Sequence, residues 1–233
     1  MRFFNALVND VRYQFKYGFY FLYAVIGSFY AAALVLCPAE YKKTAASVII
    51  LTDPAMLGTF FIGGIWLLEK REGLHGFWPV SPLKTEEYIL SKALSLASVS
   101  ALASVLIALA GLREKINFPA LFLAVFAGSV LFTVMGLFIA TYARSVNHYI
   151  LIASLPAVFF TVPPILAAFG ASNPFFEIMP GTLVWGMIAG SLGVSSGVSF
   201  FLRPLLIIWF GAFFIAARRR VYDAMPDLGV GSA

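Results

Sequence analysis

The sequence is poor in charge and in the side chains that bind metals or form disulfides. Of its 233 residues, 12% are charged, one is cysteine and two are histidine. A soluble domain usually has about 25% charged residues, so a soluble globular protein is excluded. The single cysteine, Cys37, permits no intrachain disulfide, and with only His75 and His148 it cannot complete a structural zinc site. We therefore expect this chain to bind no metal or cofactor of its own.

The common catalytic motifs are also missing. The sequence has no G-x-x-x-x-G-K-[ST] loop, so binding of ATP through a Walker A loop is excluded, and it has neither H-E-x-x-H nor G-x-S-x-G. Glu86 and Glu87 resemble the start of a paired-glutamate motif of intramembrane proteases, but Ser91 stands where that motif has arginine. Two carboxylates in the first turn of a helix are the better interpretation. We expect the chain not to be an enzyme.

Long uncharged runs dominate instead, because 61% of the residues are hydrophobic. A helix needs about 20 apolar residues to cross a bilayer. Six segments approach this length, at residues 18–37, 45–68, 86–112, 118–142, 148–170 and 198–217. They are uniformly apolar, whereas the strands of a membrane β-barrel alternate. The predicted fold is an all-α integral membrane protein, a single domain over residues 1–233 with six transmembrane helices.

Residues 172–197 are apolar but are interrupted by Pro174, Pro180 and several glycines. With six crossings, eleven Lys and Arg residues lie on the side that holds both termini and five lie on the other side. Cytoplasmic loops carry the excess of positive charge, so both termini are predicted to be cytoplasmic. A seventh crossing would move Arg218–Arg220 outside. We therefore predict that 172–197 forms an outer re-entrant hairpin between helices five and six, and that 221–233 is a short tail.

Residues 1–17 show apolar side chains at helical spacing, namely Phe3, Phe4, Leu7, Val8, Val11 and Phe15. Such a segment is typical of an amphipathic helix that lies in the interface of the inner leaflet and contacts the lipid bilayer. The alternative is a plain cytoplasmic extension of the first transmembrane helix.

The longest predicted cytoplasmic loop covers residues 69–85. Charged residues come first, then Gly73, an apolar patch and two prolines that prevent a long helix. We expect Thr85 to cap the next helix. The loop could dock into a groove on a soluble partner, or its aromatics could anchor in lipid headgroups. Its candidate docking residues are Glu69, Glu72, Gly73, Leu74, Phe77, Trp78, Pro79 and Pro82.

This loop resembles that of type-2 ABC-transporter permeases. The shared pattern is E-x-x-E-G-x-x-x-x-x-P-V-S-P-L-x-x-x-E-Y-x-x-x-K, carried here by Glu69, Glu72, Gly73, Pro79, Ser81, Pro82, Glu87, Tyr88 and Lys92. Phe77 and Trp78 depart from it, because the family more often has aliphatic residues there. Thr52, Asp53 and Pro54 are similar to the drug-export, fluoroquinolone-type branch.

The resemblance implies a permease of the inner cell membrane that exports a hydrophobic or amphipathic compound. It implies two separate ATPase subunits that hold ATP and Mg²⁺, a second permease copy, and a coupling role for the loop. Helices one, two and five of the two copies would face each other across the substrate path. A stand-alone membrane protein, either an ion-coupled transporter or an integral enzyme, is the alternative, and a non-transporting scaffold subunit is a third. No nucleic-acid partner is expected.

A few polar or helix-bending residues inside the membrane are candidates for the substrate path or a gate. Asp53 lies about eight residues inside the outer end of the predicted second helix, next to Pro54. A carboxylate at such a depth is costly, so it is either functional or held by a structural hydrogen bond. Pro163 and Pro164 form either a hinge or a fixed kink, and Glu177 either lines the exit or faces water.

Overall fold

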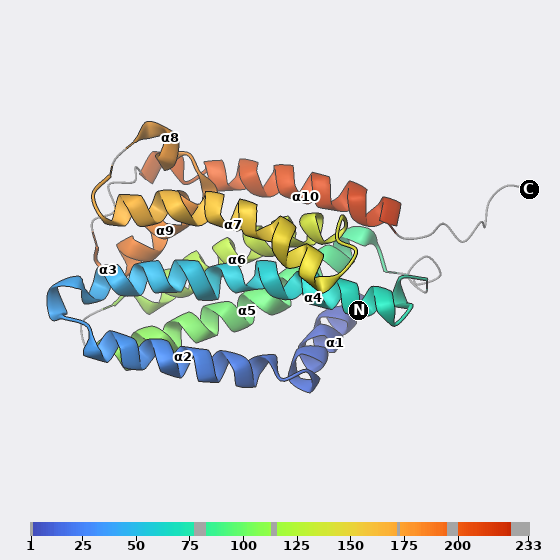
Figure 1. Ribbon diagram of the computed structural model, residues 1–233, viewed down its shortest axis with the longest axis horizontal. Coiled ribbons are helices and arrows are strands. Elements are labelled where there is room, and N and C mark those ends of the chain that lie inside the picture. The colour runs from blue at the N-terminus through green and yellow to red at the C-terminus, as the bar shows by residue number, and fades with distance from the viewer. Residues whose placement is uncertain (1, 77–82, 113–115, 172, 195–199, 225–233) are drawn as a thin grey trace, which may run out of the picture.

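The computed structural model describes residues 2–76, 83–112, 116–171, 173–194 and 200–224, and over these ranges the chain is helical without strands. Its longer helices are α1 (Arg2–Lys16), α2 (Phe19–Leu36), α3 (Ala39–Ile50), α4 (Met56–Arg71), α5 (Thr85–Gly111), α6 (Phe118–Ala140), α7 (Val146–Ala168), α9 (Pro180–Ser191) and α10 (Leu205–Ala224). The short elements are the π-helical turn η1 (Leu51–Ala55), the 3₁₀ turns η2 (Leu74–Gly76) and η3 (Phe200–Leu202), and α8 (Pro174–Glu177). Figure 1 shows the long helices side by side in one bundle, with α1 at an angle across one end.

Five helical segments are long and apolar enough to cross a membrane, so the chain is a multi-pass membrane protein. They are α2, the continuous helix Ala39–Arg71, α5, α6 and α7. The remaining long helix, α10, carries Arg218, Arg219 and Arg220 in its second half. Its uncharged part, residues 205–217, reaches only about 20 Å at the rise of an α-helix. The sixth crossing therefore stays a prediction.

Two helix boundaries differ from those expected from the sequence, and a proline explains each. The second membrane helix was expected over 45–68 but runs without a break from Ala39 to Arg71, because it begins directly after Pro38. The last helix was expected over 198–217, but α10 begins at Leu205, just after Pro204. Proline lacks a backbone N–H, so it is readily accommodated at the start of a helix, where that N–H would have no partner within the helix.

The earlier start of the second helix moves Asp53 away from the helix end. The sequence suggested a depth of about eight residues, whereas fourteen residues separate Asp53 from Ala39. This spacing corresponds to about 21 Å along the helix. Asp53 therefore lies in the middle of the 33-residue helix, within η1.

The helices form a buried centre and an exposed periphery. In the most apolar 18 residues of α5 and α6, 61% and 67% of the residues are buried inside the chain. The corresponding fractions are 11% for α2 and 28% for α7. In Figure 1, α2, the α3–α4 helix and α7 lie on the near side of the bundle, with much of α5 and α6 behind them. The exposed side chains of α2 and α7, such as Phe21 and Leu155, are large and apolar. These faces suit lipid or another apolar protein surface.

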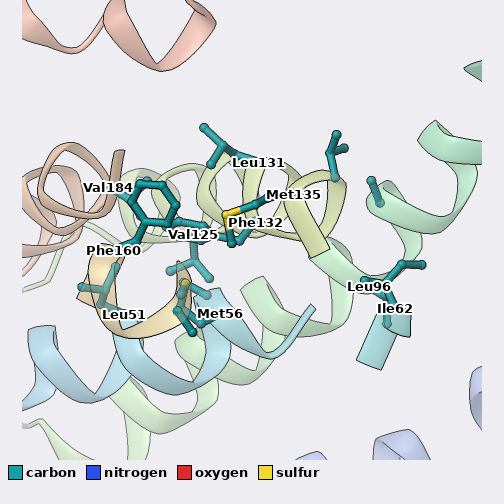
Figure 2. Close-up of a cluster of buried hydrophobic side chains, with 14 of the residues drawn as sticks. Leu51, Met56, Ile62, Leu96, Val125, Leu131, Phe132, Met135, Phe160 and Val184 are labelled. Atoms are coloured by element: carbon teal, nitrogen blue, oxygen red, sulfur yellow. The ribbon is translucent and has the colours of Figure 1, made fainter. Parts of the chain in front are cut away.

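The core lies where α4, α6, α7 and α9 meet. Figure 2 shows part of it, including Met56, Phe132, Met135 and Val184. Glycine permits the close approach of the backbones: a methyl group on Gly63 would overlap the Tyr149 ring of α7. Small residues give membrane helices this close packing in the absence of a hydrophobic driving force between them.

The described part of the predicted hairpin contains α8 and α9. With twelve residues, α9 is about 18 Å long, too short for the hydrocarbon layer of about 30 Å. Ten of its residues are buried, and it packs against α6 and α7. Protein-covered backbone at such a place is what a re-entrant segment requires. Its depth in the membrane stays a prediction.

Candidate functional site

The residues around the predicted cytoplasmic loop meet at one end of the bundle, where α4 ends, α5 begins and α1 crosses them (Figure 1). Four of the candidate loop residues, Phe77, Trp78, Pro79 and Pro82, lie outside the described residues. The described flanks of the loop contain a buried ionic cluster, which we define as Asp10, Glu69, Tyr88 and Lys92.

Lys92 of α5 is the centre of this cluster. Its Nζ lies 2.6 Å from Glu69 Oε1 and 2.8 Å from Asp10 Oδ1. Lys92 is 4% exposed and Glu69 is 5% exposed, so these charges are removed from water. A buried ion is tolerated only when partners compensate its lost hydration. Lys92 therefore joins α1, α4 and α5 at a single atom.

Tyr88 completes the partners of Glu69. Its hydroxyl donates a 2.7 Å hydrogen bond to Glu69 Oε2, so each carboxylate oxygen has its own donor. The Lys92 Nζ also lies 5.0 Å from the centre of the Tyr88 ring, within the range of a cation–π contact. Tyr88 and Lys92 are one helical turn apart, which places both on the face of α5 that meets α4.

Two further bonds fasten α1 to the same place. The Gln14 amide donates to Ser95 Oγ of α5 at 2.8 Å, and the Tyr17 hydroxyl donates to Glu72 Oε1 at 3.3 Å. Asp10 and Gln14 are four residues apart and share one face of α1, and Tyr17 follows directly after the end of this helix. Phe4 and Phe15 of the same helix are each 65% exposed. The helix thus carries a polar stripe bound to protein and apolar side chains left uncovered.

The described part of the loop folds back onto α4. Gly73 adopts a φ of +73°, which favours glycine, and η2 follows it. The His75 ring packs against the Trp66 ring in a tilted arrangement, with 4.1 Å between centroids. Burial, together with the positive charges of Lys70 and Lys92, lowers the pKa of His75 to about 4. The imidazole is therefore neutral at neutral pH.

The start of α5 differs from the expectation in one detail. Thr85 was expected to cap the helix, but Lys84 occupies the cap position and Thr85 is the first helical residue. The Lys84 backbone N–H donates to Glu87 Oε2 at 2.9 Å. Glu87 is the third residue of α5, and its side chain accepts from the backbone as the glutamate of a capping box does. The hydroxyl that usually completes such a box is replaced here by Lys84. Nearby, Arg218 Nε of α10 lies 2.6 Å from Glu86 Oε1.

The structure brings together some of the predicted site residues and separates others. Glu69 lies in the ionic cluster, Gly73 and Leu74 lie in the turn beyond it, and Glu72 is exposed beside Tyr17. The candidate path residues lie elsewhere: Asp53 and Pro54 in η1, Pro163 and Pro164 buried in α7, and Glu177 half-buried at the end of α8. The proline pair does not interrupt α7, which is helical from Val146 to Ala168.

Sequence reasoning missed Asp10 and gave no specific role to Tyr88 and Lys92. Asp10 is 82 residues away from Lys92 in the chain, and its position on the polar stripe of α1 is the only signal in the sequence. The pattern E-Y-x-x-x-K does contain Tyr88 and Lys92.

The fold and the cluster define a multi-pass helical membrane protein whose loop between the second and third membrane helices is anchored to an N-terminal helix. A family model described as the fluoroquinolones export permease protein family matches residues 1–200. The chain belongs to this family. Two curated relatives from Mycobacterium tuberculosis, strains CDC 1551 and H37Rv, are each named fluoroquinolones export permease protein. Each is 26% identical over 163 residues, which cover 69% of this chain and 69% of the relative. The resemblance noted in the loop and around Asp53 is thereby confirmed.

Proposed function

We propose that this permease is the membrane subunit of an ATP-driven exporter of hydrophobic or amphipathic compounds. It works as a pair of identical chains in the cell membrane, with two ABC-type ATPase subunits bound at the end of the bundle that carries the ionic cluster. ATP and Mg²⁺ are held by the ATPase subunits. The names of the relatives make a fluoroquinolone a reasonable first substrate to test.

The ionic cluster is the observation that carries this proposal. It joins α1 to both helices that flank the loop, so a force on the loop is transmitted to α1, α4 and α5 together. A rigid, fully paired charge cluster is suited to this task because its members cannot separate cheaply in a medium of low dielectric constant. ATPase closure against the loop would then tilt the α3–α4 helix.

The arrangement of the chain supports the proposed orientation. Figure 1 places α1 and the last turns of α10 at the same end of the bundle. This end also carries Lys70, Arg71, Arg218 and Arg219, as expected for a cytoplasmic side. With exposed Phe4 and Phe15, α1 is suited to lie on the inner leaflet. The exposed near face of α2, the α3–α4 helix and α7 is where the second copy would pack.

The test is co-purification of the tagged chain with the ABC-type ATPase that it is co-expressed with, followed by vanadate-sensitive ATP hydrolysis in nanodiscs. The coupling variant replaces Leu74, Phe77 and Trp78 with Ser. The matched control is Glu177→Gln, at the opposite end of the bundle. We expect equal amounts of the two proteins with the wild type and the control, and at least a tenfold loss of bound ATPase in the coupling variant.

An unchanged amount of ATPase on the coupling variant would contradict the coupling role of the loop. If the wild-type chain holds no ATPase at all and still moves a fluoroquinolone in proteoliposomes, the stand-alone transporter takes the place of the proposal.

A further inference from the structure

Asp53 is placed differently from the other acids of the membrane helices. It lies in η1, where Leu51, Pro54 and Ala55 are buried while Asp53 itself is half-buried. A π-helical turn widens the helix by one residue and is frequent at functional sites. Pro54 lacks the N–H that an unbroken α-helix would use, which accounts for the altered turn here. The turn thus holds the Asp53 carboxylate at the edge of the core.

No described cation lies within ion-pair reach of Asp53. The other carboxylates in the five spanning segments have partners or lie near helix ends: Glu69 bonds Lys92, Glu86 bonds Arg218, and Glu87 caps α5. Glu40 is in the first turn of α3. The Tyr30 hydroxyl of α2 is the polar group that faces the Asp53 carboxylate. One hydroxyl leaves most of the acceptor capacity of a carboxylate unused.

The depth of Asp53 makes this unpaired charge costly. Tyr30 lies six residues before the end of α2, which is about 9 Å inside that helix. An ionisable side chain inside the hydrocarbon layer costs several kcal/mol unless it has a partner, and such residues usually mark a substrate or ion pathway. Asp53 therefore has no positive partner among the described residues.

The surroundings select the kind of cation. Phe29 is 72% exposed and its ring lies 6.1 Å from that of Tyr30, and other exposed side chains of α2 are also apolar. A metal ion needs several oxygen ligands, and no group of three acid, histidine or cysteine side chains that could hold one occurs among the described residues. One carboxylate with aromatic rings matches instead an organic cation with an apolar body, which gains ion pairing and cation–π contact together.

We propose that Asp53 and Tyr30 bind the positive charge of an amphipathic organic cation, such as a protonated amine on an aromatic compound. Asp53 pairs with the charge, and the Tyr30 hydroxyl fixes the carboxylate while its ring contacts the ligand. This site names the substrate class and, as a step of export, rests on the proposed function. Binding to the permease alone does not require the ATPase, so the two are tested separately.

The experiment is equilibrium dialysis with the full chain in phosphatidylcholine nanodiscs. The probe is tetraphenylphosphonium, whose charge is permanent, and the uncharged comparison is triphenylphosphine oxide. We expect Asp53→Asn to weaken binding of the cation by about tenfold or more, the effect of losing one ion pair of about 1.4 kcal/mol. Asp53→Glu keeps affinity within a few-fold, and Glu40→Gln, which removes an exposed acid in the first turn of α3, leaves it unchanged.

Tyr30→Phe separates a binding role from a folding role, because it keeps the ring and removes only the hydroxyl. We expect a loss of about threefold for the cation and none for triphenylphosphine oxide. Equal binding of the cation to wild type and Asp53→Asn overturns the inference, as does an equal loss of both probes. A wild-type chain that holds its ATPase but does not bind the cation contradicts only this site. Intact cation binding without any ATPase partner contradicts only the proposed function.

Discussion

Two of the carboxylates on the helix Ala39–Arg71 are in opposite situations. Glu69 is 5% exposed, and both of its oxygens are bonded, to Lys92 and to Tyr88. Asp53 is half-buried, at mid-helix, and has the Tyr30 hydroxyl as its polar partner. A carboxylate whose partners are all in the fold acts as a structural joint, whereas one that lacks a cation can take it from a ligand. The same side-chain chemistry thus serves two purposes on one helix.

The largest effect on stability is expected at the ionic cluster. Lys92→Met leaves Asp10 and Glu69 as buried charges without their cation, which should lower the free energy of unfolding by about 3–5 kcal/mol. Unfolding in mixed micelles by increasing SDS, followed by tryptophan fluorescence, measures it. Lys16→Met, which removes an exposed lysine of α1, is the matched control and should change little.

A rescue variant sharpens this result. Lys92→Met combined with Asp10→Asn and Glu69→Gln removes all three charges, and we expect it to recover most of the lost stability, because no buried ion is left alone. A triple variant as unstable as Lys92→Met would mean that the lost contacts of Lys92, and not the unpaired charges of Asp10 and Glu69, account for the instability.

Two adjacent glycines of α4 test the close packing of α4 against α7 between the two carboxylates. A methyl group on Gly63 would overlap the Tyr149 ring, whereas one on Gly64 meets nothing within 4 Å. Gly63→Ala should therefore cost about 1–3 kcal/mol through overpacking. Gly64→Ala should be neutral or stabilising by up to about 1 kcal/mol, because alanine favours a helix. The same SDS titration compares them, and equal effects would contradict the close approach of α4 and α7.

Lowering the pH should reduce the free energy of unfolding through His75, which lies at the end of the bundle that carries the ionic cluster. The pKa of His75 is about 4 in the folded chain, against an ordinary value of 6.5. Below pH 6.5 the unfolded chain binds a proton that the folded chain does not, so stability falls as the pH drops from 6.5 towards 4 and is flat above 6.5. We expect a loss of about 1 kcal/mol between pH 6.5 and 5, allowing for water at the ring edge.

Comparison with His75→Phe tests the source of this pH dependence. Phenylalanine keeps a ring against Trp66 but does not titrate, so stability of the variant should be level over the same range. If His75→Phe shows the same dependence of stability on pH as the wild type, groups other than His75 cause it.

The sequence predicted the membrane class and five of the crossing segments, because the thickness of the bilayer sets the length of apolar runs. It did not predict the ionic cluster. Charged residues of α1 and α5 that are 82 positions apart meet only through the packing of the helices, which leaves no trace in local patterns. The predicted depth of Asp53 was wrong for a different reason. The charged residues Glu40, Lys42 and Lys43 suggested that the helix begins after them, whereas it begins at Ala39, directly after Pro38.

The smallest expected effect distinguishes the two carboxylates most directly. Asp53→Asn keeps the size of the side chain, breaks no ion pair and removes a charge that no cation in the chain balances, so the free energy of unfolding should stay the same or rise. Glu69→Gln, the same chemical change on the same helix, weakens the contact with Lys92 and should cost about 1.5–3 kcal/mol. Both are measured in one SDS series. Equal costs would show that Asp53 is a structural hydrogen-bonding group like Glu69, and the position beside it would no longer be available to a ligand.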